Sequence, residues 1–397
     1  MIDFLPQARE LFPYTQALRR DLHIHPELGF REIRTGGIVA KELEALGIEV
    51  TKGVGKTGVV GLLEGAKPGP TLLVRFDMDA LPITEETGAE YASQNNGVMH
   101  ACGHDGHTAI GLTVAKMLHS RRDELAGTIK FCFQPSEEGH NGEEVGGAEM
   151  MIRDGVLDSP KVDRTLALHI WNERPLGWLG IAGGPVMAGA EEFKIKITGR
   201  GGHGAIPQQT VDPVVASAQM INALQTIVSR NVAPLDTAVI SVTTVHSGTA
   251  FNVIPQTAEL TGTIRTFDIG VRQRVLKRFE QIARGVGEAM GCQVDVTLKR
   301  ITPALINDNA VASKVQEAAR RVLPESDLDT AGYTTMGAED MAFMQEKAPG
   351  CYFFVGSANV EQHLDYGHHH PKFDFDEQVL IHASALMASA VMEIQNS

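Results

Sequence analysis

The sequence is poor in cysteine, in positive charge and in long hydrophobic runs. Its four cysteines are scattered over 397 residues, which does not resemble the dense disulfide framework of a small secreted protein, so we expect reduced thiols. Lysine and arginine number 35 against 49 aspartates and glutamates, giving a formal net charge of -14. An acidic chain argues against nucleic acid or an anionic membrane as a partner and favours small substrates.

Membrane and export signals are also missing. No apolar stretch is long enough to span a bilayer, and the opening residues, MIDFLPQARELF, contain no basic segment followed by an apolar run. We therefore expect a cytoplasmic protein. Apolar residues are nevertheless plentiful, at 43% of the chain, which is typical of a globular protein. A length of 397 residues exceeds what one hydrophobic core usually covers and predicts two domains.

The order of elements in the first half of the chain indicates an α/β fold. Two helical patterns precede a series of short apolar runs that are typical of buried strands: 4–22 and 36–46, then 58–63, 71–76, 127–133 and 165–170. Alternating helices and strands favour a mostly parallel sheet. Functional groups then gather beyond the carboxyl ends of the strands.

The pattern changes after about residue 190. Strand, helix, strand, strand, helix and strand follow in that order: 193–198, 212–230, 238–245, 258–267, 271–290 and 293–299. This order is that of a ferredoxin-like α+β sandwich. Beyond Pro303 the first pattern resumes, with elements at 309–322, 351–355 and 377–394. We predict a discontinuous larger domain, residues 1–187 and 303–397, and an inserted ferredoxin-like domain, residues 188–302.

The segment MHACGHDGHT, residues 99–108, contains one thiol and three imidazoles. Cys102 and His104 are one residue apart, so an extended backbone could direct both side chains at one ion, whereas a regular helix would point them apart. We therefore expect a metal-binding loop that leads into a helix at 109–118. The alternative, packed or surface histidines beside an inert thiol, is disfavoured because isolated histidines are common and this clustering is not.

Two adjacent carboxylates, Glu137 and Glu138, follow the apolar run at 127–133. Neighbours in extended backbone point in opposite directions, so one could bind a metal while the other faces the bound water and takes its proton. Taken alone, the pair is better explained as a solvated acidic turn, because Glu143 and Glu144 follow shortly.

Two further segments could complete a metal site. His169 ends an apolar run, and a histidine triplet at 368–370 lies inside the chain, which excludes an expression tag. Two divalent ions that share a bridging water could be held by one of these triplet histidines together with the following residues: Cys102, His104, Glu138 and His169. Such nitrogen, oxygen and sulfur ligands are compatible with zinc, manganese, cobalt or nickel.

A set of motifs occurs in collinear order over nearly the whole chain: DLHIHPELGF, RFDMDALP, MHACGHDGHT, PSEEG, GGHGAIP with VDPV, FNVIP and HHHPKFDFDE. Together they resemble the metal-dependent amidohydrolase branch of the aminoacylase and carboxypeptidase metallopeptidase family. Its members include N-acyl-amino-acid amidohydrolases, hippurate hydrolases, auxin-conjugate hydrolases and some carboxypeptidases. Any one motif is weak evidence, whereas the complete set in order is specific.

The resemblance assigns roles to particular residues. It implies Glu137 as the general acid/base and the following residues as ligands of two metal ions: Cys102, His104, Glu138, His169 and His369. In the family the last ligand is a histidine two residues before a proline, which is His369 here, although its neighbours His368 and His370 depart from the usual pattern. Asp79 is expected to support a ligand, and neither Asp77 nor Asp79 is assigned as one. His100 and His107 are expected to pack or to support.

The resemblance also gives the inserted domain a part in the reaction. His203 corresponds to a histidine that helps to hold the substrate carbonyl oxygen, and the glycines around it would let the backbone approach closely. Asn252 and Arg265 are candidates for gripping the substrate, since an arginine can pair with a free carboxylate. A structural ion pair on a sheet is an equally good explanation of Arg265. In relatives this domain forms a dimer interface, so we expect a homodimer or homotetramer.

The implied function is metal-dependent hydrolysis of the amide bond in N-acyl-amino acids. The nearest alternative is a carboxypeptidase or dipeptidase that uses the same site. More distant are an amidase whose substrate has no free carboxylate, and a metal-binding regulatory or storage protein. Glu137 beside Glu138 argues against a storage protein, because such a site needs no base beside its ligand. The sequence leaves open the acyl group, the amino acid and the metal.

Overall fold

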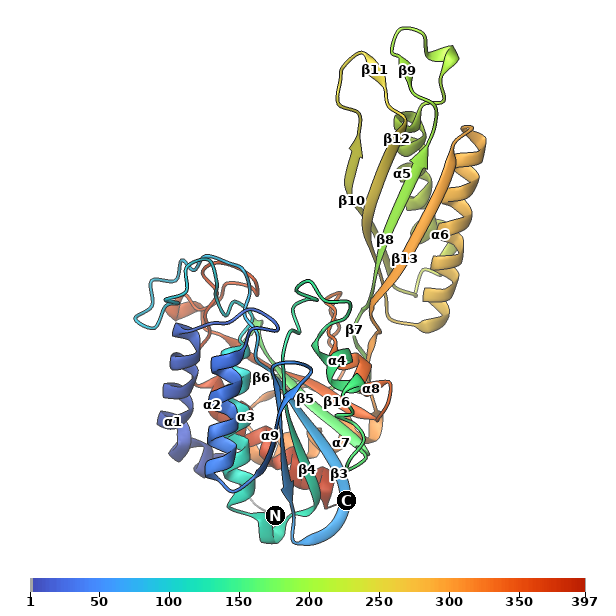
Figure 1. Ribbon diagram of the computed structural model, residues 1–397. Coiled ribbons are helices and arrows are strands. Elements are labelled where there is room, and N and C mark those ends of the chain that lie inside the picture. Colours follow the sequence, from blue (N-terminus) through green and yellow to red (C-terminus); the bar gives the residue numbers. More distant parts are fainter. Residues whose placement is uncertain (1–2, 397) are drawn as a thin grey trace. The chain divides into compact units, whose positions relative to one another are not determined.

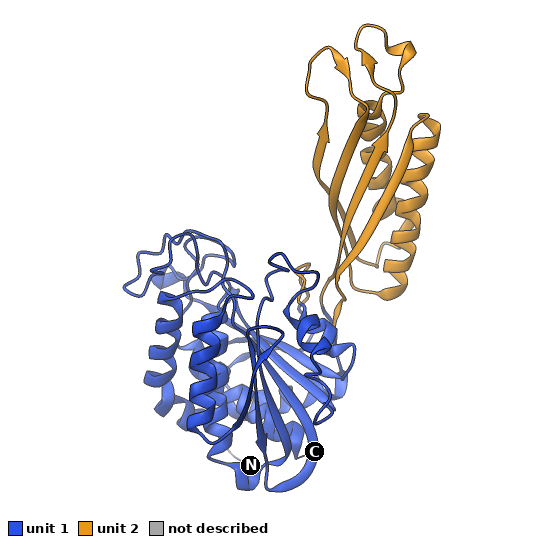
Figure 2. Ribbon diagram, viewed as in Figure 1, with its two compact units in different colours: residues 1–186, 306–333, 340–397 blue, residues 187–305, 334–339 orange. Residues whose placement is uncertain are grey.

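The computed structural model describes residues 3–396, which form two compact units (Figure 2). The first comprises the chain up to Val186, Ile306–Tyr333 and the chain from Asp340 onward; the second comprises Met187–Leu305 and Thr334–Glu339. The predicted insertion, 188–302, lies within the second unit. Residues 187, 303–305 and 334–339, which the prediction placed in the larger domain, group with the second unit. Over the described residues, no helix is long and apolar enough to cross a membrane.

An eight-stranded sheet forms the centre of the first unit, in the order β1-β2-β4-β3-β5-β16-β6-β15 (Figure 1). Its strands have these bounds: β1 Glu49–Val54, β2 Gly58–Glu64, β3 Lys67–Asp77, β4 Ala126–Gln134, β5 Arg164–Pro175, β6 Trp178–Gly180, β15 Asp327–Asp329 and β16 Gly350–Ala358. The central strands β4, β3, β5 and β16 are parallel, whereas β1, β2 and β6 pair with their inner neighbours in antiparallel fashion. The predicted mostly parallel sheet is confirmed.

The register of the central strands brings polar residues to one edge of the sheet. Asp77, the last residue of β3, pairs with Gln134, the last residue of β4. Arg75 of β3 pairs with Ala167 of β5, so His169 lies two residues further along β5, level with Asp77. β5 extends beyond His169 to Pro175, whereas the sequence pattern ends that strand near His169. The carboxyl ends of β3 and β4 therefore meet the middle of β5.

The α-helices and two short 3-10 turns of this unit surround the sheet: α1 Leu5–Ile24, α2 Ile33–Ala45, α3 His104–His119, η1 Arg122–Glu124, α4 Gly147–Arg153, α7 Asn309–Val322, α8 Met341–Gln345, η3 Val360–Gln362 and α9 Val379–Gln395. α9 is apolar almost all round and nearly every residue of it is buried, as expected for a helix enclosed by the core. α7 instead has a single apolar stripe, which includes Val311, Val315 and Val322. The sequence pattern did not predict β1 or the short elements α4 and α8.

The second unit has the ferredoxin-like order that the sequence predicts. It consists of the following elements: β8 Gly189–Thr198, α5 Pro213–Asn231, β10 Ala238–Ser247, β12 Thr257–Thr266, α6 Ile269–Ala289 and β13 Gln293–Thr302. The sheet order is β10-β12-β8-β13, all antiparallel. Along β8, Phe193, Ile195 and Ile197 are buried in one core with apolar residues of α5 and α6, while the intervening residues are exposed, as a half-buried strand requires.

Smaller elements complete the chain. A short antiparallel ribbon pairs β9 (Gly202–His203) with β11 (Val253–Ile254) in the second unit, next to the 3-10 turn η2 (Pro207–Gln209). β7 (Gly184–Met187) pairs with β14 (Leu305–Asn307). The ribbon carries His203, and the residue before β11 is Asn252.

Candidate metal centre

The side chains predicted as metal ligands converge in the first unit. Sγ of Cys102 lies 3.5 Å from Nε2 of His169. Oε1 of Glu138 lies 4.0 Å from Nε2 of His104 and 3.3 Å from Nε2 of His369. Three overlapping groups of potential ligand atoms lie within 4.8 Å of one another: Cys102 with His104 and His169, Cys102 with Glu138 and His369, and His104 with Glu137 and Glu138. The fold thus brings together segments that are up to 267 residues apart, Cys102 and His369 among them.

The local backbone at Gly103 explains how Cys102 and His104 reach the same place. Gly103 is the N-cap of α3 and has φ +89, a left-handed conformation that glycine adopts without strain. A Cβ there would meet no atom closer than 3.7 Å, so the requirement is conformational rather than steric. The prediction of a loop up to residue 108 is wrong, because α3 begins at His104. The change of direction at Gly103, and not an extended backbone, therefore brings the side chains of Cys102 and His104 to the same place.

Glu137 and Glu138 also differ from the expectation. An extended backbone would point them in opposite directions, yet both place a carboxylate oxygen within 4.8 Å of a ring nitrogen of His104. The reason is that the chain bends at Glu138, and Ser136 before them is left-handed, with φ +50. The pair is not a solvated turn, because Glu138 is only 11% exposed.

Asp79 supports two of these side chains. The Nδ1–H of His104 donates to the carbonyl oxygen of Asp79 at 3.0 Å and lies 3.2 Å from its carboxylate. The backbone N–H of Glu138 donates to the same carboxylate at 3.0 Å. With the proton held on Nδ1, the Nε2 lone pair of His104 faces the cluster, which is the usual arrangement of a metal-binding histidine. Asp79 is positioned as a supporting residue.

Two buried polar atoms in this cluster test whether it suits a cation. Nε2 of His104 and Oε1 of Glu138 are buried, and neither has a hydrogen-bond partner among the described residues. Buried polar atoms are nearly always bonded. These two atoms lie 4.0 Å apart, a separation at which a cation between them could bind a lone pair of each. The surrounding nitrogen, oxygen and sulfur donors are those of transition metals. The residues therefore fit a metal.

The electrostatics of the cluster agree with this assignment. Burial and the nearby carboxylates Glu138 and Glu137 hold the pKa of the Cys102 thiol well above its usual range. Cys102 would thus become a thiolate only beside a cation. Burial lowers the pKa of His104, but the carboxylates of Asp77 and Asp79 outweigh it and raise that pKa to about 10. The same negative charge would let a divalent ion take the place of the proton on Nε2, so that His104 binds the ion through that nitrogen.

The surroundings of His169 leave the lone pair of its Nε2 available to a metal. Burial and the neighbouring imidazoles of His107 and His368 hold the pKa of His169 well below its usual range, so its ring is neutral. Its Nδ1–H donates to the carbonyl oxygen of Ile170 at 2.6 Å, which leaves Nε2 directed at Cys102. His107 lies beside it as a supporting residue. Its Nδ1 bonds Asp77 at 2.6 Å, and its Nε2 accepts from the N–H of Ile170 at 2.9 Å.

The three histidines of the triplet have different surroundings. Nε2 of His369 faces Glu138, and the N–H of His369 donates to the carbonyl of Ala101 at 2.8 Å. His368 stacks against Trp171 with ring centroids 4.8 Å apart, and its Nδ1 lies 3.8 Å from Sγ of Cys102. His370 stacks on Tyr366 away from this group. Of the triplet, His369 shares a candidate metal group with Cys102 and Glu138.

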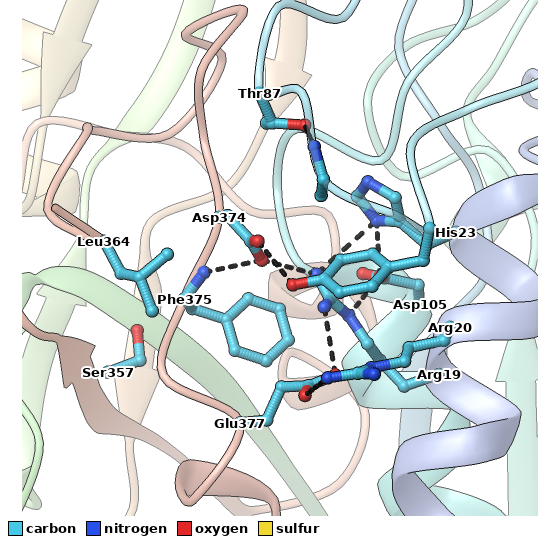
Figure 3. Close-up of polar contacts among 12 residues, drawn as sticks. Arg19, Arg20, His23, Thr87, Asp105, Ser357, Leu364, Asp374, Phe375 and Glu377 are labelled. Carbon is cyan, nitrogen blue, oxygen red and sulfur yellow. Dashed lines mark hydrogen bonds and ion pairs between the residues drawn. The ribbon is translucent and has the colours of Figure 1, made fainter. Parts of the chain in front are cut away.

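A buried ion-pair network adjoins the cluster, and no sequence motif predicted it (Figure 3). The fully buried guanidinium of Arg19 donates to Asp105 at 2.8 Å, to Asp374 at 2.8 Å and to Glu377 at 3.2 Å. Asp105 follows His104 directly, and Asp374 lies five residues after His369. Arg19 of α1 therefore ties together two segments that carry candidate ligands. No spacing rule connects Arg19 with these partners, because they are distant in the chain.

His100 has no such network. It is 2% exposed, and neither of its ring nitrogens has a hydrogen-bond partner among the described residues. Burial lowers its pKa to about 4, so the ring is a neutral packing element.

The remaining site candidates lie in the second unit. His203 pairs with Val253 across the β9–β11 ribbon, and the N–H of Gly204 donates to the carbonyl of Asn252 at 2.8 Å, so His203 and Asn252 are close together. Arg265 pairs with Ala190 at the far end of β12. At about 3.4 Å per residue, Arg265 lies about 27 Å along β12 from Thr257, the end of the strand that is nearer to the ribbon.

The hydrogen bonds of His203 and Arg265 leave donor groups of both side chains available. Nδ1 of His203 accepts from the N–H of Ala205 at 3.0 Å, so its Nε2 carries the proton and can donate. Arg265 donates to the hydroxyl of Thr263, and burial lowers its pKa. Among the described residues no carboxylate pairs with Arg265, which speaks against a structural ion pair.

Residues 73–393 match the family model described as Peptidase family M20/M25/M40. The chain is 40% identical to N-acetylcysteine deacetylase of Bacillus subtilis, with 94% of each protein covered. It is 39% identical to thermostable carboxypeptidase 1 of Saccharolobus solfataricus, with 94% of this chain and 93% of that protein covered. A crystal structure of a dinuclear metal-binding peptidase of the M20 family from Bacillus subtilis has a TM-score of 0.85 and 35% identity, covering 98% of this chain and 99% of the other.

Proposed function

The chain belongs to peptidase family M20/M25/M40, and from this premise we propose that it is a metal-dependent amidohydrolase that cleaves the amide bond of N-acyl-amino acids. One observation carries the proposal. Nε2 of His104 and Oε1 of Glu138 face each other, buried and without hydrogen bonds, in a cluster that also contains the carboxylate of Glu137. The similar deacetylase and the dinuclear M20 peptidase support the same chemistry.

We assign two divalent metal ions to this cluster, with these residues as ligands: Cys102, His104, Glu138, His169 and His369. When bound, the two ions would lower the pKa of a water molecule and polarise the scissile carbonyl. Glu137 would take a proton from that water and deliver it to the leaving nitrogen, as a general base and then a general acid. Zinc, manganese, cobalt and nickel all suit the donor set.

We assign the substrate contacts to the second unit. His203 would donate from Nε2 to the carbonyl oxygen as negative charge develops there, and this is supported by its Nδ1 already accepting a hydrogen bond. Asn252 and Arg265 would hold the amino-acid part; because they lie far apart along the second unit, they would reach one small substrate from two different subunits of the proposed dimer or tetramer. The guanidinium of Arg265, without a carboxylate partner among the described residues, would be available for the free carboxylate of a substrate.

We further propose that the first unit is the catalytic domain and that the insertion, 188–302, is a lid and association domain through which a homodimer or homotetramer forms. Large apolar side chains exposed on the second unit support association: Ile206, Leu235, Val245, Phe251 and Val253. A cytoplasmic location stays a prediction.

The test compares the wild type with Glu137→Gln after chelation and reloading with each of the four metals. Glu137→Gln should bind as much metal as the wild type and lose turnover by about 10²-fold or more, because the base is missing. Equal activity would remove Glu137 from that role. Absence of turnover by the metal-loaded wild type on all acylated amino acids and peptides would refute the proposal as a whole.

The second candidate is a carboxypeptidase or dipeptidase, favoured by the similarity to thermostable carboxypeptidase 1. Three matched substrate classes separate the possibilities: N-acetyl-amino acids, dipeptides and acyl-dipeptides. Corresponding amides that lack the free carboxylate test the assignment of Arg265. If Arg265 binds that carboxylate, Arg265→Met should raise KM for the acids and leave the already poor amides unchanged.

A further inference from the structure

We propose that Glu32 is a positioning residue for the reaction: its buried carboxylate fixes the turn at Ser136 and thereby directs the carboxylate of Glu137. The inference rests on the proposed function, because it presupposes that Glu137 is the base. Glu32 lies in none of the metal groups and contacts none of the proposed ligands.

The turn at Ser136 needs to be held. Ser136 is fully buried and has φ +50, a conformation that is uncommon for residues other than glycine and persists only when its surroundings enforce it. Its N–H donates to Oε1 of Glu32 at 2.9 Å, and its carbonyl accepts from the N–H of Gly147 at 2.9 Å. Its hydroxyl donates to the carbonyl of Gly139 at 2.7 Å and accepts from Asn141 at 2.9 Å. Every polar group of Ser136 is therefore bonded.

Glu32 makes few contacts besides this one. It is 0% exposed, and its second oxygen accepts from the hydroxyl of Thr57. Within the described part of the chain no cationic side chain pairs with it, so an ion pair does not explain its burial. Burial and the nearby Asp79 raise the pKa of Glu32 to about 7. A buried carboxylate without a cation is costly, and here its oxygens bind one hydroxyl and the backbone of the turn.

The backbone on both sides of Glu137 is held by a buried carboxylate. Glu32 accepts from Ser136, the residue before Glu137, and Asp79 accepts from Glu138, the residue after it. Asp79 also contacts His104, so its replacement would disturb the metal ligands. The contact between Glu32 and Ser136 can instead be removed without disturbing the proposed metal ligands.

Gly29 provides an independent way to disturb the same turn. A Cβ at Gly29 would lie 2.4 Å from Oγ of Ser136 and 2.2 Å from Nδ2 of Asn141, closer than real contacts allow. Gly29→Ala must therefore displace the side chains of Ser136 and Asn141, whose hydrogen bonds help to hold the turn, while the hydrogen bond between Glu32 and Ser136 is left chemically possible.

The first measurement is steady-state kinetics on an N-acetyl-amino acid with metal analysis of the same preparations. Glu32→Ala should lower kcat about 10- to 100-fold, because a misplaced catalytic group loses this much, with KM and metal content within about twofold of wild type. Glu32→Gln should restore most of kcat, because its amide oxygen can accept from Ser136 and its amide nitrogen can donate to Thr57. A Gln variant as slow as the Ala variant would overturn the proposal.

The matched control is Glu27→Ala. Glu27 accepts from the N–H groups of Arg34 and Thr35 at the start of α2, at 3.0 and 2.8 Å, and no contact joins its side chain to the turn. This variant should unfold at a lower temperature and keep its kcat. A loss of kcat as large as that of Glu32→Ala would show that any disturbance of this segment slows the enzyme, and would refute a specific role for Glu32.

A double-mutant cycle links the effect to the base. Adding Glu32→Ala to Glu137→Gln should cause no further loss of kcat, because there is no base left to position; a full further loss contradicts the proposal. If Glu32→Ala does not fold or loses metal, Gly29→Ala decides, with lower kcat at full metal content supporting the proposal and unchanged kcat refuting it. A metal-loaded wild type without turnover would defeat the proposed function itself, whereas an inactive Glu137→Gln beside a fully active Glu32→Ala would defeat this inference alone.

Discussion

Replacing Arg19 should destabilise the first unit more than replacing any other charged residue outside the metal centre. Its guanidinium is fully buried, donates to Asp105, Asp374 and Glu377, and lies 4.3 Å from the ring centroid of Phe375 (Figure 3). Arg19→Met keeps the apolar stem of the side chain and removes the guanidinium with its charge. Asp374 would then be left buried without a cation, and Asp105 would keep only His23 as a positively charged partner, which is far less favourable than removing a whole ion pair.

The size of the effect follows from burial. Removing one partner of a buried pair costs about 3–5 kcal/mol. Arg20 is the matched control, because it is the next residue of the same helix and contacts the same Glu377 at 2.6 Å, yet its side chain is 39% exposed. An exposed pair contributes about 1 kcal/mol or less. At roughly 2–4 °C per kcal/mol for a large domain, Arg19→Met should lower Tm on the order of 10 °C and Arg20→Met by only a few degrees.

Scanning calorimetry of the metal-loaded and the chelated protein measures this difference. The transition of the first unit must be followed by itself, because two compact units need not unfold together. Since Arg19 joins the segments that carry His104 and His369, Arg19→Met should also weaken metal binding. Equal Tm shifts for the two variants would refute the reasoning, as would a loss below about 1 kcal/mol for Arg19→Met.

Two other predictions concern the metal and pH. Cys102→Ser should lower the affinity for zinc more than that for manganese, because a soft thiolate is replaced by a hard hydroxyl; competition titrations with a chromogenic chelator measure the ratio, and an unchanged preference would exclude Cys102 as a ligand. Burial lowers the pKa of His23, but Asp105 outweighs it and raises that pKa to about 9, from an ordinary value of 6.5. The protonated ring therefore stabilises the fold fully below pH 6.5, and this contribution, about 3 kcal/mol, is lost as pH rises through 9. Denaturation curves between pH 6 and 10 should fall more steeply for the wild type than for His23→Gln, and parallel curves would contradict the assignment.

Local patterns in the sequence predicted most of the longer helices and strands and their order. Strand and helix periodicity predicted the parallel core strands and the ferredoxin-like order of the second unit, because each element must bury its own apolar face. The composition of MHACGHDGHT indicated metal chemistry, since clustered thiols and imidazoles are typical metal ligands, whereas the pair Glu137–Glu138 taken alone favoured a solvated acidic turn. The edge strand β1 was missed because its residues are mostly exposed and leave no apolar pattern.

Only the tertiary structure decided how the side chains meet. The left-handed residues Gly103 and Ser136 redirect the chain in ways that an assumed extended backbone does not, so Glu137 and Glu138 both approach His104. The burial of Arg19 and Glu32, and the different surroundings of the three triplet histidines, depend on contacts between segments far apart in the chain. Periodicity and spacing record which face of an element is apolar. They carry no information on which distant group a polar side chain will meet, because that depends on how the packed elements bring their ends together.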